Sequence, residues 1–215
     1  GAGSSGSLTV TGTGSQMTVN NGLTVGFMGV GTLLVQSGGA ANVNGTFNGS
    51  LAVGSSPGSN GSSVTINGLG SQLNVLGRAA FVGLEGNATL NVQSGGALNA
   101  PRLGIGVSAT GVTGTVNVSG AGSQITLGGP TTSSFGGVFQ TTIIIGFGGS
   151  GTLNITNGGK VLAEPTVANH QASMNLGLVH TTTGIGGTGT VTVSGAGSEL
   201  RIRGNGAAWG DGDGD

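Results

Sequence analysis

The chain has 215 residues, of which 51 are Gly and 5% are charged, and its formal net charge is −1 at pH 7. Its five Lys and Arg residues form no dense cluster, which argues against binding nucleic acid through the phosphates. A hydrophobic content of 35% is too high for a solvated disordered chain, and the Gly residues lack the three-residue period of collagen. No apolar run reaches about 18 residues, so no transmembrane helix is predicted, and the absence of Cys excludes disulfides and thiolate zinc sites.

Short apolar–x–apolar pairs recur along the chain and predict strands, because alternate residues of a strand face the same side. The first set of pairs is Leu8/Val10, Leu33/Val35, Val64/Ile66, Leu90/Val92, Val116/Val118, Leu153/Ile155 and Val191/Val193. After a Gly-containing turn comes the second set, Met17/Val19, Ala41/Val43, Leu73/Val75, Leu98/Ala100, Ile125/Leu127, Val161/Ala163 and Leu200/Ile202. The third set ends in Gly and comprises Leu23/Val25, Leu51/Val53, Ala80/Val82, Leu103/Ile105, Ile143/Ile145, Met174/Leu176 and Ala207/Trp209.

These three sets predict seven rungs of three short strands. One rung cannot bury its inward side chains alone, whereas a stack of rungs can. We therefore predict an all-β protein, a right-handed parallel β-solenoid (β-helix), since right-handed crossovers are the usual ones between parallel strands. The solenoid is a single repeat region over residues 1–215, with rungs that start near residues 7, 31, 63, 88, 114, 151 and 189.

The turn after the first strand alternates between two forms. Odd rungs carry a longer turn (TGTGS, NGLGS, SGAGS and SGAGS) and even rungs a shorter one (SGG, SGG and NGG). Gly tolerates positive φ at a tight corner, and Ser or Asn satisfies backbone groups there. No helix is predicted after the Gly-rich turns, so they indicate corners of the solenoid rather than a phosphate-binding loop.

Insertions interrupt the regular rungs at 128–142, 164–173 and 178–187. The first two follow the second strand of neighbouring rungs, so we expect them to lie side by side, and insertions on one face of a solenoid often form its binding face. The candidate binding residues in these two insertions are Phe135, Phe139, Glu164 and His170.

The sequence offers few groups for chemistry. His170 and His180, with Glu164, suggest a metal or acid–base site, and the alternative is that they are solvent-facing polar residues. The chain has no spaced carboxylate pair for glycoside hydrolysis and no G-x-S-x-G nucleophile elbow, so we predict that it is not an enzyme. Catalytic residues and cofactors are accordingly expected to be absent, with calcium as the one candidate ion.

That candidate calcium site lies in the last five residues, where carboxylates alternate as they do at the start of a calcium-binding loop. The candidate ligands are Asp211, Asp213 and Asp215, and the alternative is an acidic solvated loop. Outward Thr residues such as Thr9 suggest an ice-binding face, although Asn91 and other Asn residues hold the same slot in other rungs, as expected of an ordinary solvated strand. Trp209 suggests sugar stacking, but its register favours an inward core position.

The paired signatures GTLNITNGG (151–159) and GTVTVSGAGSEL (189–200), with related copies at 31–39, 88–96 and 114–125, resemble the repeats of bacterial autotransporter passenger regions. The resemblance covers roughly residues 7–203. It implies a β-solenoid passenger that is exported by a Gram-negative bacterium and displayed at the outer-membrane surface or released outside the cell as an adhesin-like protein. It implies no catalytic residues.

Together these observations favour a structural and adhesive surface protein that attaches to host or environmental glycans or proteins, with no nucleic-acid partner and no membrane insertion by this segment. The alternative is a carbohydrate-active enzyme, or an ice- or calcium-binding module, on a β-solenoid. Unpaired strand edges at the ends of a solenoid can pair with further strands. We therefore expect either a longer rod or end-to-end stacking of copies into a filament, with Ala207 and Trp209 next to the joint.

Overall fold

The computed structural model describes residues 3–45, 51–107, 111–128, 134–135, 138–165, 171–180 and 183–204, with side chains between 129 and 141 outside the description. Within these residues the chain forms strands and a single 3-10 turn, η1 (Pro57–Ser59), and no α-helix. The described part of the chain contains no helix with the length and apolarity of a membrane span. The third strand expected for rung seven, with Trp209, lies outside the described residues.

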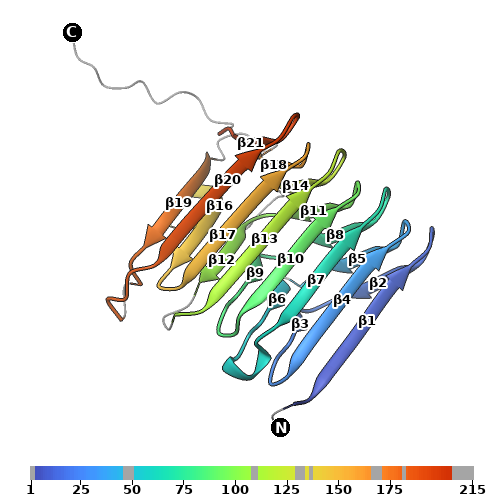
Figure 1. Ribbon diagram of the computed structural model, residues 1–215, viewed down its shortest axis with the longest axis horizontal. Coiled ribbons are helices and arrows are strands. Elements are labelled where there is room, and N and C mark those ends of the chain that lie inside the picture. Colours follow the sequence, from blue (N-terminus) through green and yellow to red (C-terminus); the bar gives the residue numbers. More distant parts are fainter. Residues whose placement is uncertain are drawn as a thin grey trace.

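The strands form three sheets that run along the length of the stack (Figure 1). Sheet one contains, in order, β1 (Ser5–Thr11), β4 (Val30–Gln36), β7 (Ser62–Asn67), β10 (Ala88–Gln93), β13 (Thr113–Ser119), β17 (Ser150–Thr156) and β20 (Thr188–Ser194). Sheet two contains β2 (Gln16–Val19), β5 (Ala40–Val43), β8 (Gln72–Val75), β11 (Ala97–Ala100), β14 (Gln124–Leu127), β18 (Lys160–Ala163) and β21 (Glu199–Ile202).

Sheet three closes the rungs with β3 (Leu23–Val25), β6 (Leu51–Val53), β9 (Ala80–Val82), β12 (Leu103–Val107), β16 (Val138–Phe147) and β19 (Gln171–Leu178). Each strand pairs in parallel with the equivalent strand of the next rung, in the register that the apolar pairs predict; for example, Leu90 lies opposite Val116. The predicted parallel β-solenoid of about seven rungs is therefore confirmed.

The core is a column of aliphatic side chains between the three sheets. In the interior rungs these side chains are fully buried, as at Leu90, Ile125 and Ile145, which are all 0% exposed. At the ends of the described stack the same positions are open, because a neighbouring rung covers them on one side only. Leu8 in rung one is 43% exposed and Val193 in rung seven is 45% exposed. Burial thus depends on the neighbouring rungs, as expected of a stacked repeat.

The short turns of the even rungs are tight two-residue turns of the I′ type, in which both central residues have positive φ. In rung four, Ser94 has a φ of 55° and Gly95 a φ of 87°, and the Gly96 N–H donates to the Gln93 carbonyl at 3.0 Å. The long turns of the odd rungs close instead with a Ser N–H, as in rung five, where the Ser123 N–H donates to the Gly120 carbonyl at 3.1 Å.

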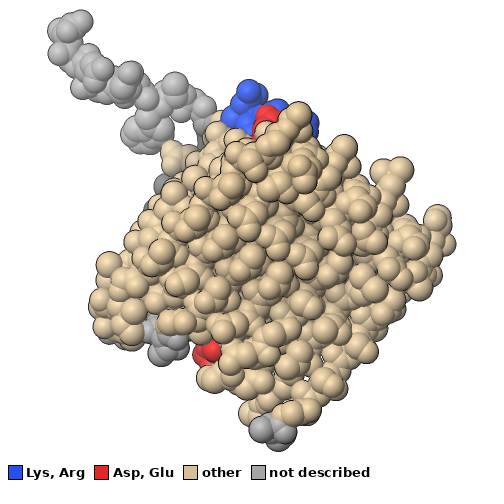
Figure 2. Space-filling view, in the orientation of Figure 1, with Lys and Arg blue, Asp and Glu red and all other residues tan. Residues whose placement is uncertain are grey.

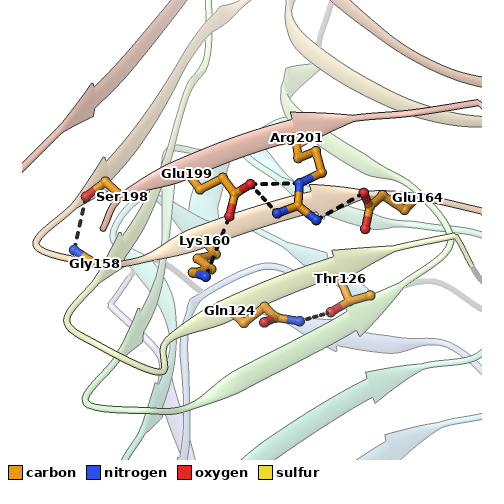
Figure 3. A network of polar contacts seen from close by, with 8 residues as sticks. All are labelled: Gln124, Thr126, Gly158, Lys160, Glu164, Ser198, Glu199 and Arg201. Atoms are coloured by element: carbon orange, nitrogen blue, oxygen red, sulfur yellow. Dashed lines mark hydrogen bonds and ion pairs between the residues drawn. The ribbon is translucent and has the colours of Figure 1, made fainter. Parts of the chain in front are cut away.

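In rungs three, five and seven, a serine hydroxyl couples the long turn to the short turn of the rung before it. We call this arrangement the serine clasp: the hydroxyl donates to a carbonyl within its own turn and accepts the N–H of the first turn Gly in the preceding rung. In rung five, Ser123 Oγ lies 2.7 Å from the Ser119 carbonyl and 3.0 Å from the Gly95 nitrogen. The other two clasps are Ser71 with Asn67 and Gly38, and Ser198 with Ser194 and Gly158 (Figure 3).

The insertions lengthen sheet three in rungs five and six. Residues 138–142, which the sequence places in an insertion, belong to β16, and β15 (Ser134–Phe135) pairs antiparallel with its first residues. Downstream, Gln140 lies opposite Gln171 in the parallel pairing of β16 with β19. The first two insertions therefore rejoin the solenoid at neighbouring positions. The third insertion turns back on itself through a bridge between Val179 and Gly186.

Candidate functional site

The outer face of sheet one is a regular array of uncharged polar side chains. Its outward positions form three columns with one residue per rung, because the register is continuous through all seven strands. The columns are Ser7, Thr32, Ser63, Thr89, Thr115, Thr152 and Thr190; Thr9, Leu34, Thr65, Asn91, Asn117, Asn154 and Thr192; and Thr11, Gln36, Asn67, Gln93, Ser119, Thr156 and Ser194. Every member is polar except Leu34, and no member is charged.

Figure 2 shows the breadth of this array. The broad face toward the viewer carries no Lys, Arg, Asp or Glu side chain, and charged side chains gather at its upper edge, near β21, with a small acidic spot at the lower edge. Strands of a sheet lie about 4.8 Å apart, and alternate residues along a strand about 6.7 Å apart. The array therefore presents hydroxyl and amide groups at regular intervals in two directions.

Hydrogen bonds hold the Asn side chains of the array in place. The Asn117 amide donates to Asn91 Oδ1 at 2.9 Å, and the Asn154 amide donates to Asn117 Oδ1 at 2.9 Å. A second hydrogen-bonded row joins Asn42, Asn74 and Asn99 on the outer face of sheet two. In each row the hydrogen bonds between side-chain amides fix the side-chain orientations, so the remaining donors and acceptors face solvent in a defined arrangement.

A charged cluster occupies the end of sheet two at rungs six and seven (Figure 3). Arg201 on β21 forms ion pairs with Glu199, its close neighbour on the same strand, and with Glu164, at 3.4 Å. Lys160 on β18, in rung six, has its Nζ 3.6 Å from Glu199 Oε2 in rung seven. Arg203 lies 3.8 Å from Glu164 and is the most exposed member.

The electrostatics of the cluster are those of a solvated network. The hydrogen bond from Arg201 lowers the pKa of Glu199, and the positive charges of Arg201 and Lys160 act in the same direction. The same hydrogen bond raises the pKa of Arg201. Each carboxylate is satisfied by a cation, and exposed pairs of this kind contribute little to stability. The cluster contains three cations and two carboxylates, so both carboxylates are paired and one positive charge remains.

The structure places the predicted site residues unequally. Glu164 lies in the charged cluster, with Arg201 and Arg203 rather than with a histidine. The backbones of Phe135 and Phe139 belong to the β15–β16 hairpin. His170 and the candidate calcium ligands Asp211, Asp213 and Asp215 lie outside the described residues.

The second histidine of the predicted site is described and has other neighbours. The His180 ring packs against Phe147 with ring centroids 4.8 Å apart, and Thr183 Oγ1 lies 3.2 Å from His180 Nδ1. Among the described residues no group of three or more His, Asp or Glu side chains is arranged to hold a metal ion.

Sequence reasoning missed two of these features. The first column of sheet one, which runs from Ser7 to Thr190 and contains only Ser and Thr, was visible in the sequence only as scattered outward Thr residues. Its alignment depends on the register of all seven strands, which has to be followed along the whole sheet. The charged cluster had a signal that pointed to it: Lys160 and Glu199 occupy the same position before the second apolar pair in consecutive rungs, and opposite charges there meet across the sheet.

Comparisons with protein-family models, with curated proteins and with solved structures found no match.

Proposed function

We propose that the chain is a structural and adhesive solenoid, displayed at a bacterial cell surface or outside the cell, and that the outer face of sheet one is its attachment surface. The cellular setting follows from the resemblance of its repeats to passenger regions. The attachment role is supported by the three polar columns, which offer a wide, neutral and regular set of hydrogen-bonding groups.

Neutral glycans are the ligand class that this face suits best. Sugar hydroxyls are both donors and acceptors, as are the Ser, Thr and Asn groups of the columns. The face carries no charge that would select an ionic ligand, and its Asn side chains are oriented by hydrogen bonds before any ligand arrives. Preorganised groups lose less conformational entropy on binding. Repetition along seven rungs also allows many weak contacts to act together on a polymeric ligand.

A pair of matched variants tests this proposal. Thr115 lies in the middle of the Ser/Thr column of sheet one, and Thr126 lies in the equivalent outward region of sheet two, in the same rung. We expect the protein to bind neutral glycans on an array without releasing reducing ends. Thr115→Glu should abolish that binding because it buries a carboxylate in the interface without a cation, whereas Thr126→Glu should retain it.

Three results would contradict the proposal. Retention of binding by Thr115→Glu would show that the ligand does not use the outer face of sheet one, and equal loss in both variants would show that binding is not specific to that face. Turnover of a polysaccharide would favour the alternative of a carbohydrate-active enzyme. Circular dichroism of both variants controls for folding, since each substitution is at an outward position.

A further inference from the structure

The outward Asn side chains of rungs four, five and six form one directional row. We call it the Asn row, and it consists of Asn91, Asn117 and Asn154. The register places these residues side by side on β10, β13 and β17. The Asn117 and Asn154 amides each donate to the Oδ1 of the Asn in the preceding rung, at 2.9 Å in both cases. The hydrogen bonds of the row therefore all point in the same sense along the stack.

The Asn row keeps hydrogen-bonding capacity for a ligand. A side-chain amide has two N–H donors and an oxygen with two lone pairs. Asn117, in the middle, uses one N–H and one lone pair within the row, so one of each remains. All three side chains are half-buried on the outer face of the sheet. Neighbouring hydroxyls of a sugar ring supply the matching acceptor and donor.

The outer face of sheet one repeats along the stack and not along a strand. Along the stack an Asn recurs in successive rungs about 4.8 Å apart, a spacing close to the length of one sugar residue in an extended chain. Along β13 the outward groups are Thr115, Asn117 and Ser119, and the strand ends at the last of these. A ligand with a repeating unit therefore meets a repeating partner only if its chain crosses the strands.

We propose that the Asn row binds a linear, neutral polysaccharide with an extended backbone, of the β-1,4-glucan type, whose chain runs along the stack with one sugar residue per rung. An extended chain keeps successive residues in line with successive rungs, whereas a coiled chain leaves the row after a few residues. The inference rests on the proposed function, since it concerns the same face. It adds the shape of the ligand, its direction and the residues that contact it.

Sheet two provides a matched control, because Asn74 is the centre of an equivalent row on its outer face. Each column also contains a natural Leu, namely Leu34 in sheet one and Leu162 in sheet two. A Leu is thus accepted at an outward position of both columns. Asn117→Leu and Asn74→Leu each remove the central amide of one row, and only the first changes the proposed ligand contact.

The probes are cello-oligosaccharides, which are extended β-1,4-glucans, and malto-oligosaccharides of the same lengths, whose α-1,4-linked chains coil. Calorimetric titration measures their affinities. We expect the affinity of the parent for cello-oligosaccharides to rise steeply up to the trisaccharide, which covers the three Asn rungs, and more slowly beyond it. Asn117→Leu should weaken binding of the trisaccharide by roughly tenfold, as expected for the loss of one or two hydrogen bonds, and Asn74→Leu should leave it unchanged.

A second pair of variants tests the direction of the chain. Asn154 is the neighbour of Asn117 along the stack, and Ser119 is its neighbour along the strand. Asn154→Leu should end the steep rise at the disaccharide, because two Asn side chains remain in line. Ser119→Leu should leave the length at which the rise ends unchanged.

Other results would overturn the inference. It is wrong if Asn117→Leu and Asn74→Leu bind the trisaccharide equally, if malto-oligosaccharides bind as tightly as cello-oligosaccharides, or if Ser119→Leu rather than Asn154→Leu changes the length dependence. In those cases the proposed function stands as long as Thr115→Glu abolishes glycan binding. If the parent binds no neutral glycan, or if Thr115→Glu still binds one, both proposals are wrong. Circular dichroism of each variant controls for folding.

Discussion

The serine clasp makes a sharp prediction about stability, because the same residue type occupies clasped and unclasped positions. Ser123 is 0% exposed, and its hydroxyl bridges the Gly95 N–H and the Ser119 carbonyl. In Ser123→Ala the Gly95 N–H loses its acceptor inside the stack, where water cannot easily replace it. An unsatisfied buried donor costs about 1–3 kcal/mol.

We expect Ser123→Ala to lower the free energy of unfolding by about that amount, which for a chain of this size corresponds to a fall in Tm of roughly 2–12 °C. Urea denaturation followed by circular dichroism measures the change, and the midpoint is the quantity to compare, because stacked repeats need not unfold in a single step.

Ser15→Ala is the matched control. Ser15 has the same turn backbone, but its side chain is exposed and unclasped, so its replacement should leave the midpoint within the range of ordinary surface substitutions, about 0.5 kcal/mol. If Ser15→Ala destabilises the chain as much as Ser123→Ala, the hydroxyl acts within its own turn, and the coupling between rungs inferred from the clasp is refuted.

Two further predictions concern a crowded corner and the charged cluster. Gly151→Ala would bring a Cβ into steric conflict with the Ile105 carbonyl oxygen, so it should lower the free energy of unfolding measured in urea by about 1–3 kcal/mol. Gly6→Ala, at the same register position with open space around it, should be neutral, and equal costs of the two substitutions would argue against crowding as the cause. Because the Arg201 hydrogen bond lowers the pKa of Glu199, the network stabilises the fold above the ordinary glutamate pKa and loses that effect as the pH falls through the lowered pKa. Glu199→Gln should therefore flatten the pH dependence of the urea midpoint in the acidic range, and an unchanged profile would show that the network contributes nothing measurable.

Much of the fold was predictable because the inward positions repeat with the period of a strand. Leu90 and Val92 are recognisable as one face, and equivalent pairs recur in every rung, so the register followed from alignment of the pairs. The extension of β16 back to Val138 was not predictable, since its sequence lacks the paired pattern and its partner, β19, lies in the next rung. Ser123 was identified as a turn residue, but its second hydrogen bond crosses to Gly95, a contact that no local pattern encodes.

The candidate site, like the fold, was predictable from the sequence only in part. Outward Thr and Asn residues were recognisable one by one, and the prediction of a solvated strand was reasonable for each. Their significance depends on alignment across rungs, which places Asn117 between Asn91 and Asn154 and turns separate side chains into a hydrogen-bonded row. Glu164 was singled out for a partnership with histidine, whereas its neighbours Arg201 and Arg203 come from the following rung.

The distribution of charge makes the two ends of the described stack chemically different. β21 is the last strand of sheet two and carries Glu199 and Arg201, side chains of the type that discourages the addition of a further strand. β1 and β2 at the other end carry Ser, Thr and Gln at their outward positions and no charge. Lys160, Glu164, Arg201 and Arg203 lie with Glu199 in one cluster, whereas residues 1–77 contain no charged residue at all. The pH and the salt concentration should therefore act on the stability of rungs six and seven through sheet two, and leave rungs one and two unaffected.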